Sequence, residues 1–279
     1  MQRMPGKSLV LAGLVAGMAA WMTAAAPAEE TPLRELDTGD ASRGWEAVGR
    51  IDFGDTAFCT GALIAPDLVL TAAHCLYDKF SGAQVDISQI EFRAGWRNGR
   101  AEAYRGVRRA IVHPDYDYGS AEDMHRVAHD LALLQLDRAI RLPGLTPFAM
   151  AGRPRKGQAV EVVSYAQDRS EAPSLQEVCH VLAGRPRILM LSCDVDFGSS
   201  GAPVFRVEEG EPRIVSVVSA KAEMAERKVA LGVALGDQIE LLRARLDAGE
   251  GVIGRQAPPV RRFGGGTARA EGGAKFLRP

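Results

Sequence analysis

Hydrophobic residues fall into many short runs rich in Val, Ile and Leu, separated by turn-forming Gly, Pro and Asp. The runs read GALIAPDLVLTAA, VRRAIVHP, DLALLQL, QAVEVVSYA, LQEVCHVL, RILMLSC, APVFRV, RIVSVVSA and VALGVAL. Short β-prone segments with regular turn signals are typical of an antiparallel sandwich or barrel. The pattern therefore predicts an all-β fold, with one hairpin turning around residues 184–186.

A stretch without this pattern, RLPGLTPFAMAGRPRKG at residues 141–157, divides the strand-rich region into halves of comparable size. We expect two β units, at about 44–142 and 155–236, with a cleft between them. Each unit would have its own hydrophobic core.

Only one segment changes to a helical period. Ile239, Leu242 and Leu246 recur at helical spacing after Asp237, which predicts a helix over 237–248 with Asp237 as its N-cap. The following residues 249–279 are rich in Gly, Pro and Arg and nearly lack apolar runs. That composition predicts a disordered tail.

Residues 1–28 have the parts of a secretory signal peptide: Arg3 and Lys7, an apolar run, and an Ala-Pro-Ala site. We expect cleavage after Ala28, because Pro27 disfavours a cut after Ala26. An uncleaved membrane anchor is the alternative, since the run nearly reaches spanning length. No later run approaches that length, so a mature chain without stable membrane insertion, secreted or periplasmic, is expected. Residues 29–43 would form a leader segment.

Composition narrows the partners. The hydrophobic fraction is 46%, the charged fraction 25% and the formal net charge −1. This is an ordinary globular composition. Nucleic-acid binding would require a strongly basic face, so no nucleic-acid partner is expected.

The four cysteines are an even number in a chain expected to be exported, where disulfides persist. Of the three possible pairings, Cys59–Cys75 and Cys179–Cys193 are favoured because each pair flanks a predicted hairpin. A zinc site would be the alternative, but no C-x-x-C spacing occurs.

Candidate chemistry lies in three segments: His74 in LTAAHC, Asp130 in HDLALLQL, and a serine in FGSSGAPVF. A serine needs a base to accept its proton, and histidine has a pKa near neutrality. The histidine in turn needs an acceptor that fixes its tautomer. Each residue alone is more often a packing or turn residue, so the hypothesis depends on the combination.

In this order, LTAAHC, DLALL and GSSGAP resemble the motifs of the chymotrypsin/trypsin-like serine protease family, with a second half closest in pattern to bacterial secreted members. The resemblance covers roughly residues 44–246. It implies two antiparallel Greek-key β-barrels with the active site in the cleft between them, plus a C-terminal helix. It also implies that CTGALIAPDLVLTAAHC is the first disulfide hairpin, and that no metal or cofactor is needed.

The resemblance also distinguishes the two serines. The family nucleophile is followed by glycine, which makes it Ser200, with the Gly198 and Ser200 N–H groups as the oxyanion hole. Ser199 stands where activated digestive members have an aspartate that pairs with a newly cut N-terminal amine. Serine cannot form that ion pair, and no Ile-Val-Gly-Gly start occurs. Activation of that type is therefore not expected.

Two features bearing on specificity conflict. Asp194, six residues before Ser200, resembles the acid that selects Arg or Lys in trypsin-like pockets. Val218, two residues after Ser216, would instead narrow the pocket as in elastase-like members, while Gly232 leaves the opposite wall open. A peptide would lie along residues 214–218, which include Ser216, Val217 and Val218. The alternative hypothesis for Asp194 is that it is only a solvated acid in a loop, without a role in specificity.

These features predict a serine endopeptidase that cleaves peptides or proteins through an acyl-enzyme, with Ser200 as nucleophile, His74 as base and Asp130 orienting His74. A non-catalytic homologue that binds peptides is the alternative. A third hypothesis, a quality-control protease with an added peptide-binding module, would need a further folded domain, and none is visible after the helix.

Overall fold

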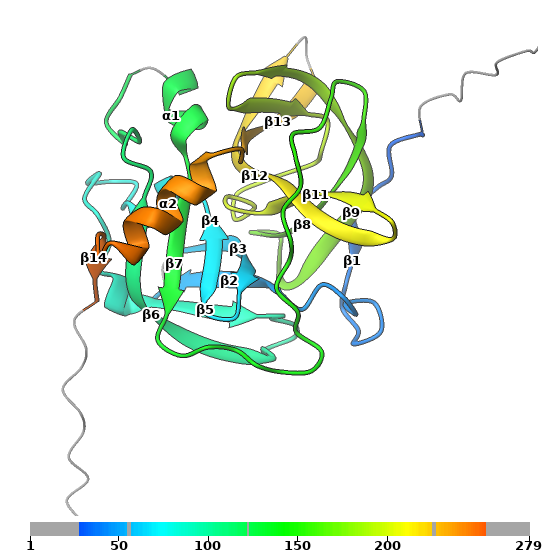
Figure 1. Ribbon diagram of the computed structural model, residues 1–279. Helices are drawn as coiled ribbons and strands as arrows, with labels where there is room; N and C mark the ends of the chain where they lie inside the picture. The colour runs from blue at the N-terminus through cyan, green and yellow to red at the C-terminus, as the bar shows by residue number, and fades with distance from the viewer. Residues whose placement is uncertain (1–27, 55–56, 122, 225–226, 255–279) are drawn as a thin grey trace, which may run out of the picture.

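The computed structural model describes residues 28–54, 57–121, 123–224 and 227–254. The predicted signal peptide, apart from Ala28, and the chain after residue 254 lie outside these ranges. Within them the chain forms two antiparallel sheets, each of which closes on itself (Figure 1). The predicted all-β fold of two barrels is confirmed.

Both barrels have the same strand topology. In barrel one the closed order is β2-β3-β4-β7-β6-β5, and in barrel two it is β8-β9-β10-β13-β12-β11. The strands of barrel one are β2 (Val48–Phe53), β3 (Ala57–Ala65), β4 (Leu68–Thr71), β5 (Ile90–Ala94), β6 (Ala103–Val112) and β7 (Ala132–Leu136). Those of barrel two are β8 (Ala159–Ala166), β9 (Arg169–Arg185), β10 (Ile188–Leu191), β11 (Pro203–Glu208), β12 (Glu211–Met224) and β13 (Arg227–Ala234).

The described residues contain two α-helices, α1 (Asp123–His129) and α2 (Gln238–Asp247). The sequence predicted α2 but missed α1, which is only two turns long, so that Met124, Val127 and Ala128 are too few apolar residues to show a helical period. Asp237 precedes α2 but makes no side-chain capping bond, so its predicted capping role is wrong. The predicted tail also begins too early, because β14 (Val252–Ile253) pairs with β6. No helix of the described ranges is long and apolar enough to cross a membrane.

The segment predicted as a leader packs on barrel two. Strand β1 (Arg34–Glu35) adds to the edge of β9 opposite Leu175 and Ser174. The side chain of Leu36, which follows, is fully buried. The segment is thus an integral part of the second sheet.

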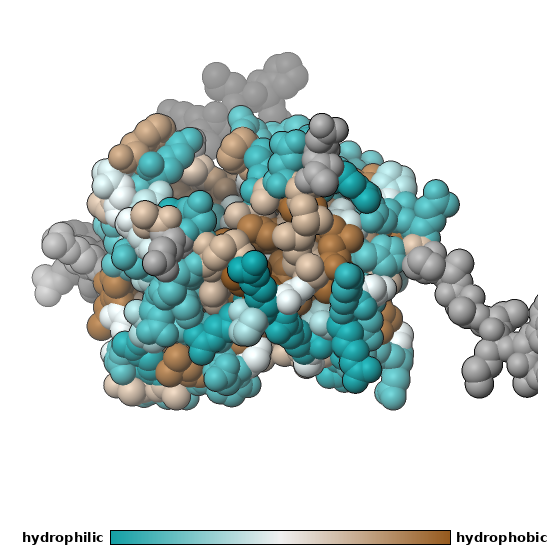
Figure 2. Space-filling model, turned by 90° about the horizontal axis from the view of Figure 1, so that it is seen from above, coloured by the Kyte–Doolittle hydropathy of each residue, from teal (hydrophilic) through white to brown (hydrophobic). Residues whose placement is uncertain are grey.

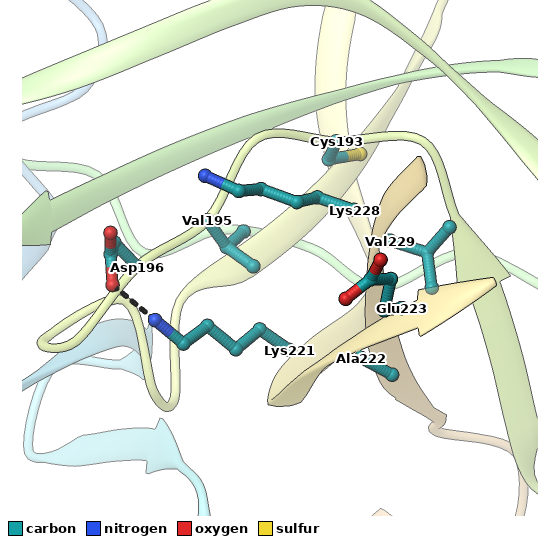
Figure 3. A pocket seen from close by; sticks show the side chains of 8 residues that line it. All are labelled: Cys193, Val195, Asp196, Lys221, Ala222, Glu223, Lys228 and Val229. Atoms are coloured by element: carbon teal, nitrogen blue, oxygen red, sulfur yellow. Dashed lines mark hydrogen bonds and ion pairs between the residues drawn. The ribbon is translucent and has the colours of Figure 1, made fainter. Parts of the chain in front are cut away.

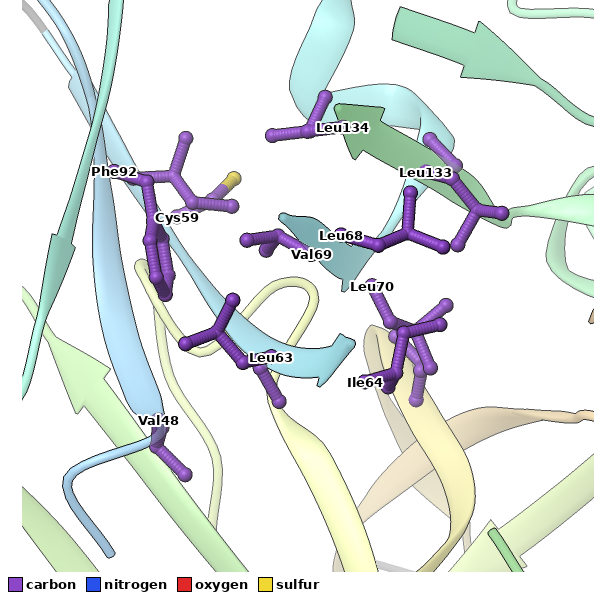
Figure 4. Close-up of a cluster of buried hydrophobic side chains, with 14 of the residues drawn as sticks. Val48, Cys59, Leu63, Ile64, Leu68, Val69, Leu70, Phe92, Leu133 and Leu134 are labelled. Atoms are coloured by element: carbon purple, nitrogen blue, oxygen red, sulfur yellow. The ribbon is translucent and has the colours of Figure 1, made fainter. Parts of the chain in front are cut away.

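Aliphatic side chains from β2, β3, β4 and β7 fill barrel one (Figure 4). The largest core cluster continues into barrel two, where Phe205 of β11 contacts two rings outside that barrel. Its ring centroid lies 4.7 Å from Phe148 in the inter-barrel connection and 5.0 Å from Trp45. Burial of aromatic surface at this joint fixes the two barrels against each other.

Two disulfides join Cys59 to Cys75 and Cys179 to Cys193, with S–S distances of 2.06 and 2.07 Å. The predicted pairing is confirmed. The first links β3 to the 3-10 helix Ala73–Leu76, and the second links β9 to the segment after β10. Each closed loop of about 15 residues is expected to contribute roughly 3 kcal/mol in the chain-entropy model.

Candidate active site

His74 and Asp130 are joined by two hydrogen bonds. His74 lies in the 3-10 helix after β4, and Asp130 lies between α1 and β7. The His74 backbone N–H donates to Asp130 Oδ1 at 2.8 Å, and the ring Nδ1 lies 2.7 Å from Oδ2. Since the carboxylate can only accept, Nδ1 carries the proton and Nε2 keeps a lone pair. Histidine in this tautomer can accept a proton at Nε2.

Burial and charge act on His74 in opposite directions. Desolvation lowers its pKa, but the charge of Asp130 and the hydrogen bond to it outweigh this effect and hold the pKa above its ordinary value. The carboxylate of Asp130 is only 4% exposed. A buried anion at this position stabilises the imidazolium that forms when His74 accepts a proton.

Ser219 is a third member of this cluster, and no motif in the sequence singles it out. Its hydroxyl donates to Asp130 Oδ2 at 2.5 Å. Ser219 lies on β12, so the contact joins barrel two to the acid carried by barrel one. The pattern VSVVS contains two serines three residues apart, and only the strand register shows which one reaches Asp130.

The turn that holds Ser200 lies against barrel one. The Thr60 N–H donates to the Ser200 carbonyl at 2.8 Å. Gly201 has a φ of 79°, and an added Cβ would lie 2.1 Å from Thr71 Oγ1. Only glycine fits this approach, which brings the Ser200 turn beside the strand leading to His74.

The same turn leaves two backbone donors unused. Neither the Gly198 N–H nor the Ser200 N–H donates a hydrogen bond within the described part of the chain. The Phe197 carbonyl accepts from the Gln167 N–H at 2.7 Å. Because a trans peptide places its N–H opposite its carbonyl, this bond directs the Gly198 N–H away from Gln167. Paired free N–H groups of this kind can bind an oxyanion.

A hollow beside this turn has a volume of about 320 Å³ (Figure 3). Val195, Ala222 and Val229 form its apolar wall, and its charged residues are Asp196, Lys221, Glu223 and Lys228, beside Cys193. Lys221 Nζ lies 2.7 Å from Asp196 Oδ1 and 4.0 Å from the Phe197 ring centroid. The face seen from above has apolar side chains near its middle between hydrophilic flanks (Figure 2).

Asp194 does not line this hollow. Cys193, Val195 and Asp196 line the hollow, whereas Asp194 between them does not and is exposed. Its backbone N–H donates to Gln176 Oε1. The proposed role of Asp194 at the base of the pocket does not fit this position.

The predicted peptide-binding positions on β12 are buried instead. Ser216, Val217 and Val218 are at most 2% exposed, and the Ser216 hydroxyl donates to the Val233 carbonyl. Gly232 packs inside the barrel, where an added Cβ would lie 2.4 Å from Ser216 Oγ. None of these four residues lines the hollow of Figure 3.

The register of β12 against β13 shifts by one residue between Val218 and Ala220, so Ser219 is an extra residue at this point of the strand. Strand β11 pairs with β12 only up to Val217, so no strand of the described ranges lies beside that edge of the later part of β12. Ser219 is still buried, and the accessible positions begin at Ala220. Lys221 to Glu223 line the hollow, and Lys228–Val229 form the opposite wall.

Two side-chain groups among the described residues have metal-ligand spacing. In Cys59, His74 and Cys75, both sulfurs belong to a disulfide and cannot act as thiolates. In the second group, His113, Asp115 and His129, the His129 Nε2 lies 2.8 Å from an Arg187 guanidinium nitrogen. That cation occupies the side on which a metal would bind.

The comparisons with known proteins agree with this geometry. The family model of the trypsin-like peptidase domain matches residues 59–213. A glutamyl endopeptidase of Bacillus licheniformis is 25% identical over 53% of this chain and 45% of its own length. The inactive serine protease scarface of Drosophila melanogaster is 29% identical over 39% of this chain and 16% of its own. The chain spans less than half the length of these curated relatives.

Among solved structures, one of a Glu endopeptidase in complex with MPD aligns with a TM-score of 0.63 at 18% identity. It covers 76% of this chain and 95% of the other. The similarity extends the agreement in fold beyond the residues matched by the family model. Since that model matches more than half of the chain, this protein belongs to the trypsin-like peptidase family.

Proposed function

We propose that the chain is an active serine endopeptidase in which Ser200 attacks the substrate carbonyl and forms an acyl-enzyme. His74 accepts the Ser200 proton at Nε2 and then donates it to the leaving amine. Asp130 holds His74 in the required tautomer, and the N–H groups of Gly198 and Ser200 bind the oxyanion. The observation that carries this proposal is the doubly bonded His74–Asp130 pair beside a turn with two unused N–H donors.

A peptide substrate would extend along the unpaired edge of β12 near Ala220 and Lys221, forming backbone hydrogen bonds as an added strand. The side chain before the scissile bond would enter the hollow of Figure 3.

We propose a preference for an acidic residue at that position. With Asp194 outside the hollow, the reason for choosing a basic residue disappears. The hollow contains Lys228 and, opposite it on β12, Glu223, neither of which has an ion pair among the described residues. Lys221 pairs with Asp196, so we assign the substrate carboxylate to Lys228. Two similar proteins carry a glutamyl or Glu endopeptidase name.

Export fits the same proposal. Two disulfides persist best in an oxidising compartment, and the first 28 residues have a signal-peptide pattern. We therefore place the working enzyme outside the cytoplasm.

The test is covalent labelling of residues 29–279 by a fluorophosphonate. The wild-type protein should take up one probe per chain and hydrolyse peptides, whereas Ser200→Ala should do neither. Ser81→Ala, which changes an exposed serine whose hydroxyl bonds Asp78, serves as the matched control and should label fully. A folded wild-type protein that takes up no probe would favour the alternative, a peptide-binding homologue without activity, as the relative named inactive illustrates.

A further inference from the structure

The Ser199 hydroxyl is the centre of a buried polar cluster below the candidate oxyanion hole. The residue is fully buried. Its Oγ lies 3.2 Å from Ser164 Oγ and 3.2 Å from the Tyr165 carbonyl. The Asp196 N–H donates to it at 3.3 Å, and Arg169 Nη2 lies 3.5 Å away. One hydroxyl therefore joins the Ser200 turn to the β8–β9 hairpin.

A count of protons fixes the direction of these bonds. A serine hydroxyl offers one donor and two acceptor positions. The Tyr165 carbonyl can only accept, so it receives the Ser199 proton. The Ser199 oxygen then accepts one hydrogen bond from the Asp196 N–H. It accepts a second from either the Ser164 hydroxyl or Arg169 Nη2, which lie next to it. All three capacities of the hydroxyl are used, as a buried polar network requires.

Arg169 anchors the cluster from the other side. Its side chain is 13% exposed. Its Nη1 donates to the Ser164 carbonyl at 2.9 Å and lies 3.2 Å from Ser164 Oγ. Burial lowers the pKa of this guanidinium, and Asp168, Asp194 and Asp196 act against that effect. Arginine is the cation best suited to such a site, because its planar fork bonds several acceptors at once.

The hairpin that carries Arg169 also contacts the turn directly. Gln167, two residues before Arg169, donates its N–H to the Phe197 carbonyl. This bond orients the peptide between Phe197 and Gly198, and thereby the Gly198 N–H. Movement of the hairpin away from Ser199 would release that orientation.

We propose that Ser199 and Arg169 are positioning residues that hold the Gly198 N–H in its oxyanion-binding orientation. Through them the turn is ordered by the folded chain itself, without an aspartate and a newly freed N-terminal amine. This inference depends on the proposed endopeptidase function, since it assigns a role within the same site.

The test compares Ser199→Ala, Arg169→Met and the double variant with the wild-type protein. Each single variant should lower kcat about tenfold, the loss expected when a buried charged or neutral hydrogen bond is removed. KM should change little, and affinity for a peptide boronate, whose adduct fills the oxyanion hole, should fall in parallel with kcat. The double variant should lose about as much as one single variant, because both changes break the same cluster.

The matched control is Arg153→Met. The Arg153 guanidinium also bonds backbone carbonyls of barrel two, those of Arg185 and Ile188, but it does not contact the Ser200 turn. It should leave kcat and boronate affinity unchanged. Arg169→Lys, which keeps the charge and loses the fork, provides a milder variant if Arg169→Met does not fold.

Kinetic values for both single variants equal to those of the control would overturn the proposal. So would a loss confined to KM, or strictly additive losses in the double variant. Failure of the endopeptidase function itself would differ, because the wild-type protein would then neither label nor hydrolyse peptides.

Discussion

At the residue scale, the His74–Asp130 pair predicts a pH dependence. A general base must be neutral, and Asp130 holds the pKa of His74 above the ordinary 6.5. Activity should therefore fall on acidification with a midpoint above that value. The same pair contributes stability that is present at low pH and lost as pH rises through the raised pKa.

Asp130→Asn should lower the midpoint of this acid limb and reduce kcat by about 10⁴-fold, since the tautomer is no longer fixed. The profile of kcat/KM against pH measures both effects. Asp67→Asn, which changes a half-buried acid of barrel one paired with Arg108, should leave the profile unchanged. If activity in Asp130→Asn falls on acidification at the same midpoint as in the wild-type protein, Asp130 does not set the pKa of His74.

At the scale of elements, β12 and β13 form the walls of the hollow, and their hairpin places Lys228 at its edge (Figure 3). Lys228→Gln should lower kcat/KM for a peptide with glutamate before the cut by about tenfold, as expected for loss of a bond to a charged group. The rate of cleavage after alanine should change less than about twofold, because the alanine side chain has no charged group for Lys228 to bind.

Lys156→Gln, an exposed lysine in the inter-barrel connection, is the control for that change. Cleavage rates across a peptide library decide the matter. Faster cleavage by the wild-type protein after arginine or lysine than after glutamate would contradict the acidic preference.

At the scale of the whole molecule, Thr60 of β3 links the two barrels through one buried side chain. Its hydroxyl donates to the Gly198 carbonyl at 2.8 Å and accepts from the Tyr165 N–H at 3.1 Å. Thr60→Val keeps the shape but leaves both groups buried without a partner. The free energy of unfolding should fall by about 2–4 kcal/mol.

Urea denaturation, with Thr146→Val as an exposed control, measures this loss. Because the Gly198 carbonyl is released as well, kcat should fall together with stability. A Thr60→Val protein as stable as the control would mean that the inter-barrel bonds contribute nothing net.

The sequence by itself determined what depends on local pattern and chain order. Short apolar runs with turn residues between them indicated the strands, and the two cysteine pairs flank hairpins that already bring them close. His74 and Asp130 each follow or precede a strand whose end is visible in the pattern. Glycine on both sides of the serine pair indicated a tight turn, because its backbone must adopt positive φ there.

Only the tertiary structure decided which side chains meet across the barrels. Ser219, the extra residue at a register shift in β12, reaches Asp130 while Ser216 does not, and hydrophobic periodicity does not encode such a shift. The direction of Asp194 away from the hollow depends on the path of its loop. The contact of Arg169 with Ser199 joins residues 30 apart and exists only after barrel two has closed. Closure of each barrel and packing between the barrels set these contacts. They join residues far apart in the chain, and the local sequence around one residue does not predict its distant partner.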